Sequence, residues 1–149
     1  MKHMSKSKKK FINIKNSKNL ISLVPPYIDD RGFIQSIINE KHTNVSIIES
    51  KKLTIRSNHY HLTDSHYMYT LKGEYYYFFK NLKSKHLSRL KVKKNQLIFT
   101  PPFEEHATIF LQNTELLVIS KNSRDQTTYE KDTVRVELIK SFEVEDYIG

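Results

Sequence analysis

Short apolar runs with a period of two residues, or of consecutive β-branched and aromatic residues, recur along the whole chain. Turn-forming residues separate the runs, and no segment has the period of an amphipathic helix. Successive strand residues point to opposite faces of a sheet, so the pattern predicts an all-β sandwich or barrel. The polar segment 122–128 is predicted to be a loop. The predicted strands are residues 10–15, 20–24, 33–39, 44–49, 53–60, 66–71, 74–80, 87–92, 96–100, 106–111, 115–120 and 133–140.

The length of 149 residues fits one domain with its own core. We predict that residues 11–149 form this domain and that residues 1–10, which contain five lysines, form a disordered basic tail. No apolar run reaches the ~18 residues of a membrane span, and the amino-terminal segment lacks the features of a signal peptide. The expected location is therefore the cytoplasm, with no membrane partner.

The charge and the absence of cysteine restrict the ligands. A net charge of +9 is compatible with nucleic-acid binding, because Lys and Arg neutralise phosphates. However, 20 of the 25 basic residues are lysines and five lie in the tail, so we expect no nucleic-acid partner. The remaining positive field suits an anionic small molecule such as a nucleotide diphosphate. With no cysteine, a metal ion must take nitrogen or oxygen ligands.

Four histidines have the spacing of a metal site. His59 and His61 are two residues apart on a predicted strand and therefore face the same side. A tight turn over residues 62–65 returns the chain, so that His66 faces the same interior, together with Met68. His106 belongs to a separate strand and can complete the site. The alternative is that these are isolated surface or hydrogen-bonded histidines. Four histidines in this arrangement favour the metal site over that alternative.

The first histidine segment resembles the first motif of the cupin superfamily, G-x5-H-x-H-x3,4-E-x6-G. His59 and His61 match the paired histidines, His66 stands where the family usually has Glu, and Gly73 follows at the family spacing. The substitution at His66 keeps a side chain that can bind a metal.

The second histidine segment resembles the second cupin motif, G-x5-P-x-G-x2-H-x3-N. Pro101 and His106 match it, Asn95 and Phe103 replace the glycines, and Phe110 replaces the Asn. The resemblance implies a cupin fold, a double-stranded β-helix or jelly-roll barrel. It also implies a divalent metal, whether Zn, Fe, Ni or Mn, on His59, His61, His66 and His106.

A finer resemblance points to the sugar-nucleotide branch of the cupins. The segments 30–33 (Asp-Arg-Gly-Phe), 44–46 (Asn-Val-Ser) and 56–61 (Arg-Ser-Asn-His-Tyr-His) look like those of dTDP-4-dehydrorhamnose 3,5-epimerases and dTDP-sugar 3,4-ketoisomerases. The stretch 58–73 also resembles the zinc-binding cupin domain of capsular-polysaccharide reductases. At 117–119 this chain reads Leu-Val-Ile where the 3,5-epimerases carry a catalytic Tyr, so the ketoisomerases are the better match.

The resemblance implies an isomerase or epimerase acting on a nucleotide-linked keto sugar in surface-polysaccharide biosynthesis. This chemistry abstracts a proton next to a carbonyl and stabilises the enolate. The candidate substrate contacts are Arg31, Arg56 and Asn44. The candidate groups for moving the proton are His59, His61, Tyr69, Glu104 and Glu105.

Two other functions remain open. Three or four neutral ligands suit the ferrous iron of an oxygenase, and four histidines could equally close the coordination sphere of a non-catalytic binding module. Cupins generally pair into dimers, so we expect a homodimer, with the early strands over residues 10–24 suited to exchange between subunits.

Overall fold

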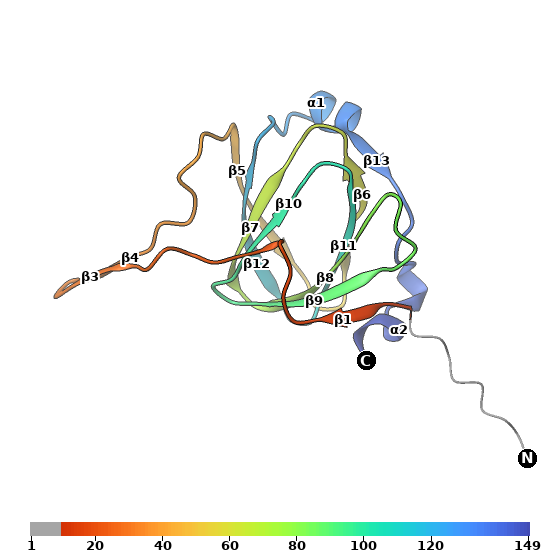
Figure 1. The fold of residues 1–149 in the computed structure, drawn as a ribbon, viewed down its shortest axis with the longest axis horizontal. Helices are drawn as coiled ribbons and strands as arrows, with labels where there is room; N and C mark the ends of the chain where they lie inside the picture. The colour runs from red at the N-terminus through yellow and green to blue at the C-terminus, as the bar shows by residue number, and fades with distance from the viewer. Residues whose placement is uncertain (1–9) are drawn as a thin grey trace, which may run out of the picture.

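The computed structural model describes residues 10–149, which form two β-sheets and a projecting hairpin (Figure 1). The six-stranded sheet contains, in order, β1 (Ile12–Ile14), β9 (Ser88–Lys93), β8 (Glu74–Asn81), β11 (Glu104–Phe110), β6 (Ile55–His61) and β13 (Thr133–Arg135). The five-stranded sheet contains β2 (Leu20–Ile21), β10 (Leu97–Thr100), β7 (His66–Lys72), β12 (Thr114–Ser120) and β5 (Asn44–Ser50). The predicted all-β class is confirmed.

The core lies between the two sheets, where their alternating inward side chains meet. Met68, Tyr77, Leu90, Phe110 and Val118 are among its buried members. Strand β12 shows this alternation most clearly, because buried and partly buried residues alternate along its whole length. Burying apolar surface contributes roughly 25 cal/mol per Å², so this alternation fixes which face of each strand points inward.

A second apolar cluster covers the outer face of the six-stranded sheet. Tyr76, Phe78 and Ile109 pack there against Ile139 and Tyr147 of the carboxy-terminal segment. The aromatic residues of β8 are therefore divided between two cores, with alternate residues on opposite faces. None of them lines the histidine cavity described below.

Two helices occur where none was predicted, α1 (Gln126–Asp132) and the short α2 (Glu145–Ile148). The expectation of a loop over 122–128 is wrong for its second half, because the Asp125 side chain accepts a hydrogen bond from the Thr128 backbone N–H and caps α1. The predicted strand over 133–140 is also too long, since only Thr133–Arg135 pairs with β6. No helix among residues 10–149 is long and apolar enough to cross a membrane.

The hairpin of β3 (Tyr27–Asp29) and β4 (Gly32–Ile34) extends away from the barrel (Figure 1). We call this hairpin the arm. Its strand β3 was not predicted. Within this chain, the early strands over residues 10–24 pair with the six-stranded and five-stranded sheets, β1 with β9 and β2 with β10.

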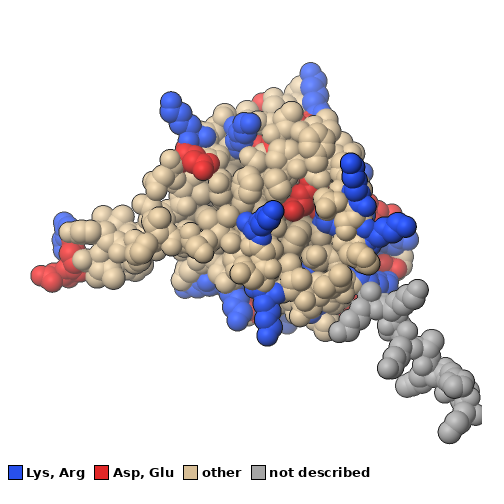
Figure 2. All heavy atoms as spheres, viewed as in Figure 1, with Lys and Arg blue, Asp and Glu red and all other residues tan. Residues whose placement is uncertain are grey.

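The predicted basic tail lies outside the described residues except for Lys10, whose Nζ is 3.3 Å from a Glu143 carboxylate oxygen and 3.1 Å from one of Asp146. Lys and Arg side chains are scattered over the face shown in Figure 2, and several of them lie close together along its lower edge.

Three turns after motif strands use left-handed backbone. Gly73 has a φ of 90°, and a methyl group there would lie 2.7 Å from the Asn113 carbonyl oxygen, so the position requires glycine. Asn95 and Phe103, which replace motif glycines, keep the left-handed conformation with φ of 68° and 62°. The loop geometry therefore survives the substitutions, with strain concentrated at Phe103 because bulky residues disfavour positive φ.

Candidate functional site

The four motif histidines lie together between the two sheets. His59 and His61 come from β6, His66 from the start of β7 and His106 from β11, and all four are buried. The expected turn after His61 does return His66 to the same interior. Strand pairing then places His106 beside His59 in the same sheet.

A backbone bulge in β6 sets the direction of its histidines. Ser57 and Asn58 have φ of 74° and 56°, and the register with β11 shifts by one residue at this point. The Asn58 side chain holds the bulge, because it donates to the Ile139 carbonyl and accepts from the Ile139 N–H. Bulges of this kind re-aim side chains next to functional sites.

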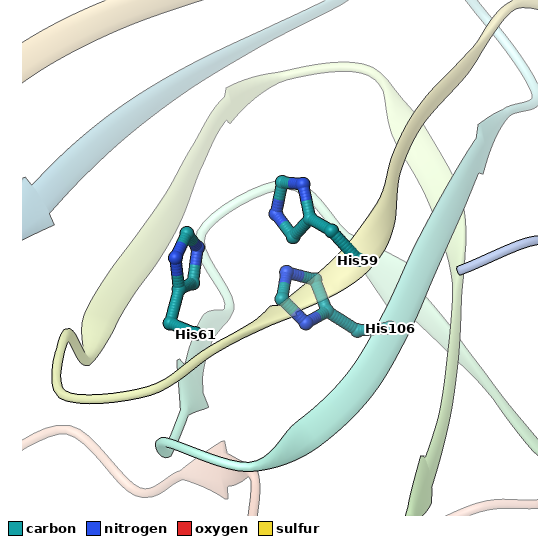
Figure 3. A group of neighbouring side chains, drawn as sticks. All are labelled: His59, His61 and His106. Carbon is teal, nitrogen blue, oxygen red and sulfur yellow. The ribbon is translucent and has the colours of Figure 1, made fainter. Parts of the chain in front are cut away.

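Three of the four histidines form the tightest group (Figure 3). One ring nitrogen each from His59, His61 and His106 lie within 4.8 Å of one another. We call these three the triad. His66 lies beside it, with its ring centroid 5.5 Å from that of His106 and 5.7 Å from that of His61, but it is not a member.

The tautomer of His106 is set by the backbone. Its Nδ1 lies 2.9 Å from the Glu104 carbonyl oxygen, so this nitrogen carries the proton. Nε2 is then a lone-pair acceptor, and it is buried without a hydrogen-bond partner among residues 10–149. A buried unsatisfied acceptor is costly, and a divalent metal ion is the kind of partner that this nitrogen and its two neighbours fit.

Burial keeps the cluster uncharged at neutral pH. It lowers the pKa of His59 to about 2 and that of His106 to about 4, with the neighbouring histidines adding to the effect. The pKa of His66 is well below its usual value for the same reasons. The pKa of His61 is lowered by burial, against which Asp64 and Asp132 act to raise it. Neutral imidazoles are the form that binds metals.

Asp132, at the end of α1, lies beside His61. One of its carboxylate oxygens lies 3.7 Å from His61 Nδ1. The same carboxylate accepts hydrogen bonds from the Thr63 N–H, the Thr63 hydroxyl and the Asp64 N–H. The turn that returns His66 to the interior is thus tied to the helix, and the carboxylate favours a proton on His61 Nδ1, leaving Nε2 free.

A cavity of about 420 Å³ is lined by His59, His61 and His66, whereas His106 is not part of its lining. Its walls include β5 and β6, which do not pair with each other, because β5 is an edge strand and β13 covers only His59 to His61 of β6. Such a volume is within the range of small-molecule sites.

Arg56, a candidate substrate contact, is among the residues that line this cavity, and it also spans the two sheets. Its Nε donates to the Ser50 hydroxyl at 2.6 Å and its Nη2 to the Glu49 carbonyl at 2.8 Å. These bonds tie β6 to β5.

Two predicted proton-transfer residues face away from the site. Tyr69 alternates with Met68 and Thr70 on β7, and its hydroxyl bonds Asn95 on the outer surface. Glu105 precedes His106 and so takes the opposite face of β11, where it pairs with Lys80 at 3.2 Å. The expectation that either residue moves the proton is corrected, because strand alternation puts both on the wrong side.

Glu104 faces inward but is engaged elsewhere. Its carboxylate accepts from the Tyr77 hydroxyl at 2.7 Å and from the Asn19 amide at 2.8 Å. Burial raises its pKa to about 7, while these two bonds lower it in part. Glu104 does not line the histidine cavity.

Two predicted substrate contacts also lie apart from the cavity. Arg31 is on the arm, 85% exposed and paired with Asp29 at 2.6 Å, so it does not reach the histidines of its own chain. Asn44 on β5 pairs with Ser120 on β12, which in turn pairs with His66 on β7. The Asn44 side-chain oxygen accepts a hydrogen bond from the Ser46 hydroxyl. Asn44 is not among the residues lining the cavity.

Sequence reasoning missed three residues of the site, Arg124, Tyr129 and Asp132. All come from the segment between β12 and β13, whose polar composition gives no periodic signal. The Tyr129 ring lies 5.6 Å from that of His61 and 6.2 Å from that of His59. The only available clue was Asp125, a helix-capping residue three positions before Thr128.

Residues 27–134 match the family described as Polysaccharide biosynthesis C-terminal domain. No curated protein matches the chain. Among solved structures, it resembles the capsular polysaccharide assembling protein CapF from Staphylococcus aureus with a TM-score of 0.58 and 21% identity, covering 78% of this chain and 33% of that one. The chain thus spans about a third of CapF.

Two further similar structures match over most of their own length. The sugar 3,4-ketoisomerase QdtA from Thermoanaerobacterium thermosaccharolyticum, in complex with TDP, has a TM-score of 0.60 and 18% identity, covering 89% of this chain and 98% of that one. The dTDP-4-dehydrorhamnose 3,5-epimerase from Sulfolobus tokodaii has a TM-score of 0.61 and 12% identity, covering 77% and 76%. These likenesses confirm the cupin fold, and the family match shows that the chain belongs to the polysaccharide biosynthesis C-terminal domain family.

Proposed function

We propose that this chain is a metal-binding cupin that isomerises or epimerises a nucleotide-linked keto sugar in surface-polysaccharide biosynthesis. The observation that carries the proposal is the buried, neutral histidine cluster at the inner end of a cavity of about 420 Å³. The family match supports the pathway class, and the similarity to QdtA, whose structure contains TDP, supports the substrate class.

The proposed reaction removes a proton from the carbon next to a keto group and returns it with a new position or stereochemistry. A divalent metal on the triad would polarise the carbonyl oxygen. The groups then left to move the proton are His66 and Tyr129, which line the cavity outside the triad. In a metal-free site, His61 is a better base than His59, because Asp64 and Asp132 raise the pKa of His61 against the effect of burial.

Solvent deuterium exchange tests the reaction. A dTDP-4-keto-6-deoxy sugar is incubated with the protein in D2O, before and after chelator treatment, with metal content measured by mass spectrometry. We expect deuterium beside the keto group, and at least about 100-fold slower incorporation in His61→Gln, either from loss of the base or from loss of a metal ligand. Loss of exchange on chelation assigns the proton transfer to the metal-loaded site. Finding neither exchange nor nucleotide-sugar binding would reject the proposal.

The two alternative functions are separable from this one. An oxygenase requires oxygen uptake after loading with Fe(II), which an oxygen electrode measures directly. A closed, non-catalytic metal site requires four ligands, whereas His66 lies outside the group of three and the cavity opens to the surface. The geometry therefore favours a site that keeps a position open.

The homodimer is also a proposal, and it rests on the arm. Tyr27, Ile28, Phe33 and Ile34 are each more than 60% exposed, although an isolated two-stranded hairpin is marginally stable in water. The free edge strand β5 carries two further exposed apolar residues, Val45 and Ile47. In a dimer, the arm of one copy can pack against strand β5 of the other. In such a dimer, Arg31 could contact the substrate bound to the neighbouring subunit.

A further inference from the structure

The guanidinium group of Arg124 belongs to the wall of the histidine cavity. It lies between β12 and α1, is half-buried and lines the cavity. Its Cζ atom is 5.2 Å from the centroid of the Tyr129 ring, a cation–π contact that holds the side chain over this wall of the cavity. It makes no hydrogen bond and no ion pair with any residue of the described range 10–149.

The other four arginines of the chain are all engaged. Arg56 bridges the two sheets as described above, and Arg89 lies between the rings of Phe11 and Tyr76 and donates to the Tyr147 carbonyl. The remaining two form ion pairs, Arg31 with Asp29 and Arg135 with Glu130. Within the described residues 10–149, Arg124 is therefore the arginine whose five donors are free for a ligand.

The charge of Arg124 reaches into the cavity. It contributes to lowering the pKa of His59, His61 and His66, after the larger effect of burial. Glu49 is the one carboxylate among the described residues of the lining, against the two cations Arg56 and Arg124. With the histidines neutral, the cavity carries a net positive charge, which favours a ligand with an anionic group.

We infer that Arg124 binds the phosphate or diphosphate group of the substrate, while the sugar faces the histidines. The inference rests on the proposed function and names the contact that selects a phosphorylated sugar over a neutral one. The guanidinium fork matches two phosphate oxygens, and partial burial strengthens the pair relative to a fully exposed one. Arg56, whose Nη1 is not used in its bonds to β5, provides a second cation in the lining of the same cavity.

Calorimetric titration with dTDP and with inorganic pyrophosphate tests this role. The full-length chain is compared with Arg124→Gln and with Lys131→Gln, which removes an equal charge from an exposed position of α1 that does not line the cavity. We expect Arg124→Gln to weaken dTDP binding on the order of 10- to 100-fold, as for a charge-assisted hydrogen bond. Lys131→Gln should change it less than about twofold.

The inference is overturned if wild-type protein binds neither probe at millimolar concentration, if Arg124→Gln binds as tightly as wild type, or if Lys131→Gln loses as much affinity. Thermal unfolding of each variant verifies the fold. Deuterium exchange on the same samples separates the two proposals. Binding of dTDP that depends on Arg124, without exchange, supports the anion contact and rejects the isomerase, while exchange that is unaffected in Arg124→Gln rejects the contact alone.

Discussion

The histidines of the site are close neighbours but not equivalent ones. Because His66 lies outside the triad, replacing it should weaken metal binding far less than replacing a triad member. We expect His106→Gln to lower the affinity for Zn²⁺ at least about 100-fold and His66→Gln less than about 10-fold. Competition with a chromophoric chelator measures both. Equal losses in the two variants would instead indicate four protein ligands.

Glu104 makes a separate contribution to the pH dependence of stability. Its pKa is about 7 in the folded protein, above its usual value of 4.5, so between these values the folded state holds a proton that the unfolded state has lost. The free energy of unfolding therefore decreases, through Glu104, as the pH rises from 4.5 to about 7. Glu104→Gln keeps an acceptor for Tyr77 and removes the ionisation.

We expect the stability of Glu104→Gln relative to wild type to be higher at pH 8 than at pH 5, by on the order of 1–3 kcal/mol in the free energy of unfolding. Urea titrations at the two pH values measure it. The buried histidines change stability in the opposite direction on acidification, but they are present in both proteins and cancel in the difference. A difference that does not change with pH would show that Glu104 ionises normally.

Among the turns, the one between β10 and β11 carries strain that can be measured. Phe103 has a φ of 62°, while its N–H donates to the His61 carbonyl and its ring is half exposed. Phe103→Gly and Phe103→Ala both remove the ring, but only glycine removes the left-handed penalty. We expect the glycine variant to be the more stable of the two by about 1 kcal/mol, measured by thermal or urea unfolding. Equal stability would indicate that this turn relaxes without glycine.

The elements that the sequence predicts well are those with two distinct faces. Strands β5, β7 and β12 follow the alternating pattern within a few residues, because one face of each is more buried than the other, whereas β8 and β11 are predicted from consecutive aromatic and β-branched residues and are buried on both faces. Strand β3 was missed, since it belongs to an arm whose residues are all at least partly exposed. Helix α1 was missed because its seven residues have no apolar face, so only its capping residue, Asp125, gives a signal.

The alternation of strand residues between two faces also explains which site residues are predictable. His59, His61 and His66 were predictable because strand alternation and one turn determine their direction. The predictions for Tyr69 and Glu105 are wrong because each is the direct neighbour of an inward-facing residue, Met68 or His106, and therefore points outward. The bulge at Ser57–Asn58 depends on a distant contact with Ile139, and no local pattern reveals it.

At the scale of the whole molecule, the arm and β5 predict self-association. We expect light scattering to give twice the 17.7 kDa chain mass for the wild type. Phe33→Asp on the arm and Ile47→Asp on β5 should each shift the protein towards monomer, because a charge is costly to bury. Phe142→Asp is the matched control, since Phe142 is 81% exposed in the carboxy-terminal segment. A monomeric wild type, or equal dissociation by the control, contradicts the dimer.

The free edge of β5 also has a consequence for handling the protein. An edge strand with exposed Val45 and Ile47 offers unpaired backbone groups to any other extended chain. When neither a second copy nor another contact covers it, this edge is where aggregation through strand addition should begin. Aggregation is thus expected to increase with protein concentration, because the concentration of uncovered edges increases with it, and variants that weaken the dimer should aggregate at lower concentration than the wild type.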